Sequence, residues 1–310
     1  MANHEPTMAE WFQSLVEPAF ILSKAMSYYI DTNLKAALRG QVLAPVLRSQ
    51  ELRDEAFGRF WVDFSSTRPD PSSSDSQGQP AVSLAPQETA TGEGEIQSST
   101  DLIPAILSQA SGLVLDVGPG TGTQLPLLKN NSSIRAIYGA EPCAGLHGEL
   151  LRRANEEGLG GIYTILPCSV VSEALRPELL RHGLATGSGS GSGVFDTIIT
   201  VRVLCSVPQF ERTAEELFAL LKPGGKMLVV EHVVNPWRTA KGSLFARVLQ
   251  VIYHALGWRW VMGDCCLDRD TERVLRGVNG GHGWESVEVE RWFGRTCIPY
   301  ISGVFVKKRN

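Results

Sequence analysis

Residues 114–122, which read Val-Leu-Asp-Val-Gly-Pro-Gly-Thr-Gly, constrain the fold more than any other stretch of the chain. An apolar run leads into Asp116 and then into Gly118, Gly120 and Gly122 at alternate positions. This order predicts a buried strand followed by a tight turn, where glycine is needed because a side chain would keep the backbone away from a ligand. The pattern therefore predicts a doubly wound α/β fold that binds a nucleoside at this turn.

A second apolar stretch, residues 134–139, is followed by Glu141, nineteen positions after Gly122. A carboxylate at the end of the second strand of such a fold is suited to accept hydrogen bonds from both hydroxyls of a ribose. A dinucleotide-binding turn has the spacing G-x-G-x-x-G, whereas residues 116–122 read D-x-G-x-G-x-G. The spacing therefore indicates a nucleoside cofactor other than a hydride-transferring dinucleotide, with Glu141 as its ribose ligand.

Short apolar runs alternate with helical patterns over most of the chain beyond residue 112. This alternation predicts a mostly parallel sheet with right-handed crossovers, in which ligands bind outside the carboxyl ends of the strands. The predicted strands are residues 113–117, 134–139, 163–167, 195–201 and 226–231, and the predicted helices begin near Gln124 or span residues 146–158 and 209–221.

Residues 1–64 have the pattern of two or more amphipathic helices, because Phe12, Leu15 and Phe20 fall near one helical face. No membrane-spanning segment is predicted, since Lys24 interrupts the most apolar stretch. The apolar face needs a partner, which is either the nucleoside-binding domain or a membrane surface. The polar residues are mixed in sign rather than basic, so we favour a cap over the binding site rather than peripheral contact with a membrane.

Two further segments are poor in apolar residues. Residues 65–100 are rich in Ser, Pro, Gln, Gly and Thr, which predicts a disordered linker between the helical extension and a domain of residues 101–310. Residues 183–193 contain alternating glycine and serine, which predicts a flexible insert within that domain.

The composition argues against several classes of protein. An apolar content of 43% over 310 residues is enough for a substantial core, while a net charge of −4 argues against nucleic acid as a partner. The six cysteines include no C-x-x-C pair, so we predict neither a metal site nor a disulfide scaffold. A reducing compartment such as the cytoplasm is expected, and the polar first eight residues are unlike a secretory signal.

Several later motifs carry a family resemblance. They are Asp-Thr-Ile-Ile-Thr-Val-Arg-Val-Leu-Cys-Ser-Val-Pro at residues 196–208, Leu-Lys-Pro-Gly-Gly at 221–225, Val-Glu-His-Val at 230–233, Gly-Asp-Cys-Cys-Leu-Asp-Arg-Asp-Thr at 263–271 and Pro-Tyr-Ile-Ser-Gly at 299–303. In this order, after D-x-G-x-G-x-G, they resemble the methyltransferase-like 7 branch of class I S-adenosylmethionine (SAM) methyltransferases. The resemblance implies a Rossmann-like, mostly parallel seven-stranded sheet. It also implies methyl transfer from SAM to oxygen or sulfur of a small-molecule acceptor, with thiol acceptors known in the branch and fungal relatives serving secondary metabolism.

The donor side of the predicted site follows the strand ends. Asp116 is expected to accept from the amino group of the methionine moiety, and the three glycines to allow close approach of the cofactor. Glu141 is expected to accept from the ribose, while residues after the third and fourth strands are expected to meet the adenine and the methionine. These last candidates are Ser169 and Val170 for the adenine, and Thr200 and Val201 for the methionine end.

The acceptor side is predicted from fewer signals. His232 directly follows the fifth strand and is the candidate general base, although a histidine there is also suited to orient another group by hydrogen bonding. Arg202, Trp260 and Asp264 are the candidate acceptor-binding residues. Two alternatives stay open, namely a cyclase of the same fold that binds SAM without methyl transfer, and a non-catalytic interaction protein.

Overall fold

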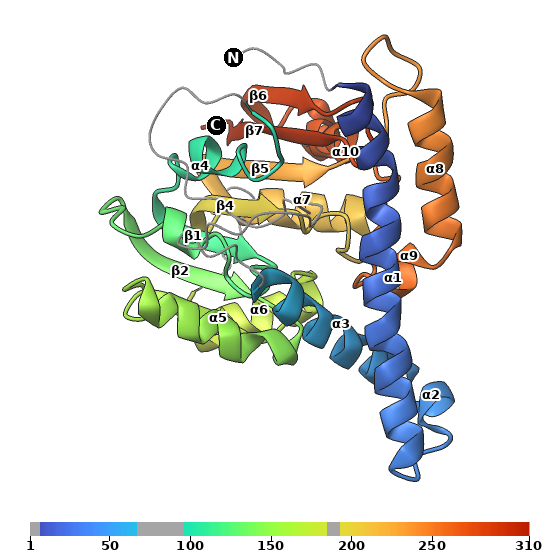
Figure 1. Cartoon of the computed structure of the whole chain (residues 1–310). Coiled ribbons are helices and arrows are strands. Elements are labelled where there is room, and N and C mark those ends of the chain that lie inside the picture. The colour runs from blue at the N-terminus through green and yellow to red at the C-terminus, as the bar shows by residue number, and fades with distance from the viewer. Residues whose placement is uncertain (1–6, 67–95, 185–192, 310) are drawn as a thin grey trace, which may run out of the picture.

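A computed structural model of the chain describes residues 7–66, 96–184 and 193–309 (Figure 1). Within these residues seven strands form one sheet in the order β3-β2-β1-β4-β5-β7-β6. Strand β7 runs antiparallel to both of its neighbours, β5 and β6, while β1 to β5 pair in parallel. The predicted doubly wound, mostly parallel seven-stranded sheet is therefore confirmed.

The strand bounds agree closely with the sequence predictions, except at the start of the fifth strand. That strand begins five residues before the predicted start, because Leu221 already pairs with Phe195 of its neighbour. The strands are β1 (Gly112–Val117), β2 (Ile134–Ala140), β3 (Tyr163–Leu166), β4 (Phe195–Val201), β5 (Leu221–His232), β6 (Trp284–Trp292) and β7 (Tyr300–Lys307).

Helices cover both faces of the sheet, and the sheet divides the hydrophobic core into two parts. Leu175 and Leu217 belong to one buried apolar cluster, and Leu107 and Leu150 to the other. The helix predicted to begin near Gln124 is a short 3-10 turn that begins at Leu125. The helices of this domain are α4 (Ile103–Leu107), the 3-10 turn η1 (Leu125–Leu127), α5 (Ala144–Glu156), α6 (Ser172–Arg181), α7 (Phe210–Leu220), α10 (Thr271–Gly277) and the 3-10 turn η2 (Val278–Gly281). The chain turns soon after η1, since Asn130 takes a positive φ of 60° shortly before β2.

Three N-terminal helices confirm the predicted helical extension. They are α1 (Met8–Leu38), α2 (Ala44–Leu47) and α3 (Ser49–Ser66). Helix α1 packs with α8 (Leu244–Ala255) and α9 (Trp258–Val261) from the segment after β5, and α3 packs with α9. Leu15, Phe60 and Tyr253 share a third buried cluster that joins the two groups of helices. Figure 1 shows α1 beside α8, with α2 and the C-terminal end of α1 reaching beyond the sheet domain.

Most of the predicted linker and insert, residues 67–95 and 185–192, lies outside the described residues. Helix α3 continues to Ser66, and Ser99 and Thr100 are buried, so both ends of the segment predicted as a linker belong to the folded structure. Among the described helices, none has the length and apolar character that a membrane span requires.

Candidate functional site

The turn after β1 has the strained geometry that its glycines predict. Gly118, Gly120 and Gly122 have φ values of 56°, 61° and 76°, in the region that residues with a Cβ rarely adopt. Space is limited as well, because a Cβ on Gly118 would lie 2.3 Å from a methyl carbon of Val203. The three glycines therefore allow a tight turn that packs closely against neighbouring side chains, at the end of β1 where the cofactor is expected.

Asp116 is buried at the end of β1, and only one of its two carboxylate oxygens accepts a hydrogen bond from a described residue. Its Oδ2 accepts a hydrogen bond from the Tyr163 hydroxyl at 3.1 Å, while Oδ1 is buried and has no partner among the described residues. Burial raises the pKa of Asp116 to about 7, although the Tyr163 hydroxyl acts in the opposite direction. Such a carboxylate is stabilised by a positively charged donor, which fits the ammonium group of a methionine moiety.

Glu141 follows β2 and faces the glycine turn. Its Oε2 accepts from the Gly120 amide at 2.9 Å and its Oε1 from the Cys143 amide at 2.8 Å. Burial raises the pKa of Glu141, against the effect of these two backbone bonds. Each carboxylate oxygen has two lone pairs, so both can accept a further hydrogen bond from a ribose diol.

The four residues predicted to contact the adenine and the methionine end of the cofactor have different surroundings. Val170 and Val201 are buried in the two separate apolar clusters of the sheet domain. Thr200 is buried and donates to the Leu228 carbonyl at 3.4 Å, whereas Ser169 is half-buried after β3. Among the described residues, no hydrogen bond joins these four side chains to Asp116 or Glu141, and their roles stay predictions.

His232 ends β5 and is buried with one nitrogen unpaired. Its Nε2 lies 3.2 Å from the Cys265 Sγ, and the Trp258 Nε1 donates to the same sulfur at 3.2 Å. Its Nδ1 is buried and has no partner within the described residues. Burial lowers the pKa of His232, but Cys205 and Glu231 outweigh it, so the pKa lies above its ordinary value.

Cys205, His232 and Cys265 converge although they come from three separate segments. One ligand atom from each lies within 4.8 Å of the other two, and all three residues are buried. Thiols and imidazoles are ligand types that zinc prefers, yet spacing along the chain gave no signal for this cluster. The absence of a bound metal stays a prediction that metal analysis of the purified protein would check.

Glu231 links the glycine turn to the His232 end of the site. Its carboxylate accepts from the amides of Val203 at 3.1 Å and Leu204 at 3.0 Å. Val203 in turn is the residue that a Cβ on Gly118 would meet. Burial raises the pKa of Glu231 to about 7, against the effect of the two backbone donors. Sequence reasoning missed this role, because neither contact follows from local spacing.

The predicted acceptor residues fall in two places. Arg202 donates to Ser99 Oγ at 2.7 Å and Thr100 Oγ1 at 3.0 Å. Asp264 and Trp260 instead hold Arg53 of α3, since Arg53 Nη2 lies 2.9 Å from Asp264 Oδ1 and its guanidinium carbon 4.2 Å from the Trp260 ring. Two of the three candidates therefore fasten an N-terminal helix, and the acceptor-binding role of all three stays a prediction.

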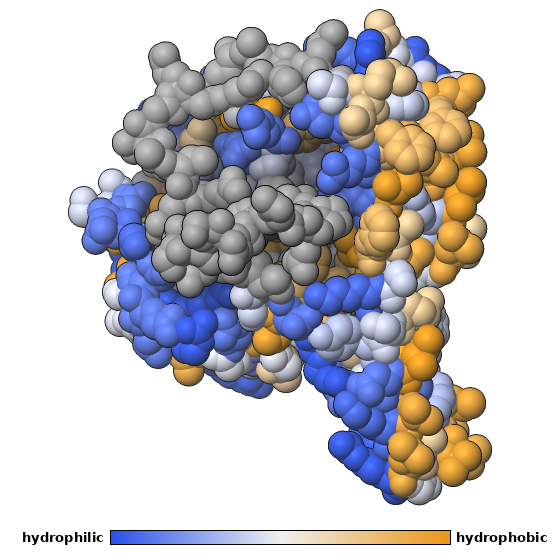
Figure 2. Space-filling view, in the orientation of Figure 1, coloured by the Kyte–Doolittle hydropathy of each residue, from blue (hydrophilic) through white to orange (hydrophobic). Residues whose placement is uncertain are grey.

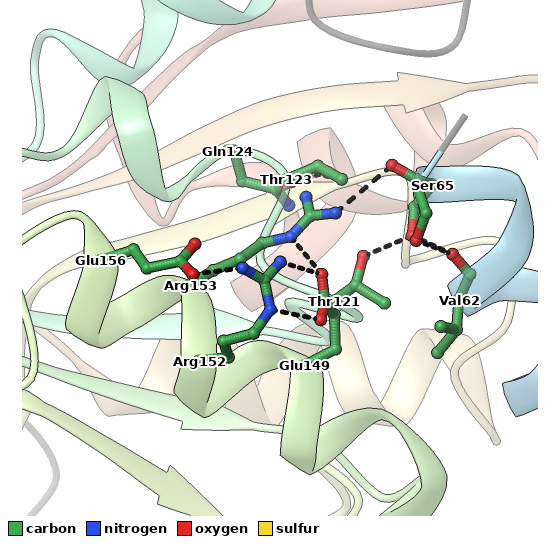
Figure 3. A network of polar contacts seen from close by, with 10 residues as sticks. Val62, Ser65, Thr121, Thr123, Gln124, Glu149, Arg152, Arg153 and Glu156 are labelled. Atoms are coloured by element: carbon green, nitrogen blue, oxygen red, sulfur yellow. Dashed lines mark hydrogen bonds and ion pairs between the residues drawn. The ribbon is translucent and has the colours of Figure 1, made fainter. Parts of the chain in front are cut away.

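Helix α3 lies across the glycine turn. A Cβ on Gly120 would come within 3.0 Å of the Trp61 Nε1. One helical turn after Trp61, Ser65 also contacts this region. The Thr121 hydroxyl donates to the Ser65 hydroxyl at 2.9 Å, and Arg153 of α5 donates to the Ser65 carbonyl at 3.3 Å (Figure 3). The sequence predicted a cap, but the residues that make these contacts carried no signal of their own.

The same helix reaches the segment between β5 and β6. A Cβ on Gly263 would lie 3.0 Å from the Phe57 ring, next to the Arg53 contacts with Asp264. Phe57 also stacks on Trp61 with ring centroids 5.8 Å apart. One face of α3 therefore covers both the glycine turn and the segment that carries the predicted acceptor residues.

The geometry fits SAM, because the unpaired Asp116 oxygen suits its ammonium group, Glu141 suits its ribose and the glycine turn admits its backbone contacts. Known proteins are similar to this chain. A family model described as a methyltransferase domain matches residues 92–287. A phosphatidylethanolamine N-methyltransferase of Cereibacter sphaeroides is 28% identical over 54% of this chain and 71% of its own length.

The thiol S-methyltransferase TMT1B of Homo sapiens is 29% identical over 37% of this chain, and the match spans 45% of that relative's length. A solved geranyl diphosphate methyltransferase in complex with SAM covers 67% of this chain at 12% identity, with a TM-score of 0.46. The domain match extends over most of the sheet and includes both Asp116 and Glu141. The chain therefore belongs to the family of methyltransferase domains, and its cofactor is S-adenosylmethionine.

Proposed function

We propose that this protein transfers the methyl group of SAM to an oxygen or sulfur atom of a small-molecule acceptor, in the biosynthesis of a secondary metabolite. The buried, unpaired Nδ1 of His232 carries this proposal, because a hydroxyl or thiol acceptor must lose a proton. The thiol S-methyltransferase among the relatives supports sulfur. The cysteines of this chain are all free, which supports a reducing compartment such as the cytoplasm.

Asp116 and Glu141 would hold two ends of the donor. When bound, SAM supplies a methyl group that is activated on a sulfonium. Asp116 Oδ1 would accept from its ammonium group, and the Glu141 oxygens would accept from its ribose while they keep the Gly120 and Cys143 amides. These contacts orient the donor before reaction, which is the main contribution an enzyme makes to an in-line displacement.

On the acceptor side, His232 would take up the proton. The Nε2 contact with Cys265 fixes the orientation of the ring and leaves Nδ1 as the free nitrogen. As the acceptor oxygen or sulfur forms its bond to the methyl carbon, the bond from that carbon to the sulfonium sulfur would break and leave its electron pair on that sulfur. The acceptor would lose its hydrogen as a proton, which Nδ1 would accept. A hydrogen bond from the acceptor to His232 would also position it along the line of displacement.

Residues 1–64 would serve as the cap that closes the site. The two rings of the stacked pair Phe57 and Trp61 face the segment around Gly263 and the glycine turn, with the Phe57 ring near Gly263 and the indole Nε1 of Trp61 near Gly120. An apolar cover excludes water, which would otherwise solvate the acceptor and compete for hydrogen bonds. This arrangement supports an acceptor with an apolar body and one reactive hydroxyl or thiol.

The test is to incubate the full chain with SAM that carries a labelled methyl group and a panel of thiols, phenols, carboxylic acids and phosphatidylethanolamine. We expect label in a thiol or phenol product. His232→Ala should lower kcat roughly 10²- to 10⁴-fold with little change in SAM affinity, while His282→Ala, at an exposed histidine, should not. Tight SAM binding without transfer to any acceptor would favour a non-methylating reaction. Transfer to the amine alone would exclude oxygen and sulfur.

A further inference from the structure

Helix α8 exposes an apolar face although its other side is firmly anchored. Gln250 on the buried side donates to the carbonyls of Val233, Leu267 and Cys297 at 3.2, 2.8 and 3.1 Å. These bonds fix the rotation of the helix, so the exposed residues cannot turn inward. The exposed large apolar side chains of α8 recur on one helical face, namely Leu244, Phe245, Val248, Val251, Ile252 and Leu256.

Helix α1 continues this surface. Its exposed large apolar residues lie within a sector of about 120° around the helix axis, at 100° per residue. This sector is separate from the residues of α1 that pack on the core. The two helices are neighbours, since the Trp11 and Phe245 rings are 6.2 Å apart and the Tyr253 hydroxyl donates to the Leu15 carbonyl at 2.7 Å. The α1 residues on this face are Met8, Phe12, Phe20, Ile30, Leu34 and Leu38.

The same surface extends to the tip of the helical extension, where Val42, Leu43, Val46 and Leu47 in and around α2 are exposed. Figure 2 shows hydrophobic residues along one side of the molecule, from the region of α8 down to α2, with hydrophilic residues on the opposite side of the same helices. We call the exposed apolar residues of α1, α2 and α8, together with Val42 and Leu43, the apolar face. A face of this extent marks an interaction surface.

The charge around the apolar face identifies its partner. Residues 237–263 contain Arg238, Lys241, Arg247 and Arg259 and no Asp or Glu. Among the described residues, the first three of these form no ion pair, and Arg259 approaches only Asp264, at 3.8 Å. On the hydrophilic side of the extension the cations are paired, for example Lys24 with Asp63 at 2.7 Å. Positive charge that forms no ion pair among the described residues therefore lies next to α8 and its part of the apolar face.

Two tryptophans flank α8. Trp237 and Trp260 are 40% and 44% exposed, and they precede and follow the helix in the chain. Exposed indoles beside an apolar stripe and unpaired cations are typical of helices that lie in the headgroup region of a membrane. A second copy of this chain fits less well, because a two-fold contact through α8 would bring the same unpaired cations together.

We infer that the apolar face binds the surface of an anionic phospholipid membrane, with α8 and α1 lying in the plane of the interface. From the sequence we favoured a cap over membrane contact, because the charges of the N-terminal helices are mixed in sign. The structure adds α8, which supplies the basic residues. Both roles hold together, since α3 covers the site while α1 and α8 present their other side outward.

The test measures binding of the full chain to vesicles of phosphatidylcholine, with and without phosphatidylserine, by co-sedimentation. We expect binding to the anionic vesicles that weakens with added salt. Lys241→Glu with Arg247→Glu should weaken that binding roughly ten-fold or more, and Phe245→Glu with Val248→Glu should do the same. Leu151→Glu with Leu180→Glu is the matched control, because both leucines are exposed on α5 and α6, away from the apolar face, and binding should not change.

Phe245→Glu also removes the ring contact between Phe245 and Trp11, so a second double variant, Val251→Glu with Leu256→Glu, tests the apolar face without changing that contact. Circular dichroism verifies the fold of each variant. Equal binding by the face variants and the control pair would overturn the inference. A second result would also overturn the inference. If the protein forms a stable dimer that does not bind vesicles, and Val251→Glu with Leu256→Glu converts this dimer to a monomer, then a second copy of the chain is the partner of the apolar face.

Discussion

Asp116 gives the binding of SAM a predicted pH dependence. Burial raises its pKa to about 7, and a bound ammonium group favours its ionised form. SAM affinity should therefore rise as pH increases from 6 to 8, by about ten-fold, because the ionised fraction of a group with this pKa increases by that factor. Calorimetric titration of SAM over this range measures the change. Asp116→Asn should bind SAM more weakly and with almost no pH dependence, and an unchanged slope in that variant would remove the assignment.

Glu141→Ala removes the carboxylate predicted for the ribose. Hydrogen bonds to a charged group contribute about 1.5–3 kcal/mol, so SAM affinity should fall roughly 10- to 150-fold. Glu156→Ala on the same stretch of chain is the control, since that side chain is exposed at the end of α5. Equilibrium binding, with a thermal melt to verify folding, measures both variants. Full affinity in Glu141→Ala would show that the ribose is held elsewhere.

Residues close together in sequence were predictable, and those joined only by the fold were not. Asp116 and Glu141 could be placed at the ends of β1 and β2 because the glycine turn and the apolar runs fix these positions along the chain. Tyr163, Val203 and Cys265 contact Asp116, Gly118 and His232 from other strands and loops, so no local pattern announces them. Arg202 was read as an acceptor ligand because a long cation after β4 stood out. Its partners Ser99 and Thr100 lie about one hundred residues away.

At the scale of elements, the strands were predictable because buried parallel strands are apolar runs between turns. The helix predicted to begin near Gln124 is only the 3-10 turn η1, and the chain turns shortly afterwards at Asn130, which has a positive φ. The position of α3 could not be predicted from its own sequence. Its place over the glycine turn depends on tertiary contacts such as that of Ser65 with Thr121.

Arg53 is predicted to hold α3 closed. Its side chain is only 10% exposed, pairs with Asp264 and donates to the Trp260 carbonyl at 2.9 Å. Arg53→Ala should therefore let α3 open more often, and the amides of residues 49–66 should exchange hydrogen faster. Arg48→Ala is the matched control, because Arg48 forms an exposed pair with Glu51 near the start of the same helix. Equal exchange in both variants would show that α3 does not depend on this contact.

For the molecule as a whole, Asp116 and Glu231 place two buried carboxyls with pKa values of about 7 at the ends of β1 and β5. In the unfolded chain the two carboxyls have their ordinary pKa values of 3.8 and 4.5, so between roughly pH 4.5 and 7 the folded state holds protons that the unfolded state has lost. Their contribution to the free energy of unfolding is present below the unfolded pKa values. It is lost as pH rises through about 7, by up to about 1.4 kcal/mol per pH unit for each group.

The free protein should therefore unfold at a lower urea concentration at pH 8 than at pH 5.5. SAM should stabilise the folded protein at both pH values, by about 2.7 kcal/mol at one hundred times Kd. It should also narrow the difference between the two pH values, because its ammonium group stabilises the ionised form of Asp116, which predominates at pH 8. Glu231→Gln should reduce the dependence on pH while its amide oxygen still accepts from Val203. Urea titrations at both pH values, with and without SAM, measure these effects. A free protein that is more stable at pH 8, in the wild type and in Glu231→Gln alike, would mean that both carboxyls are already ionised in the folded state.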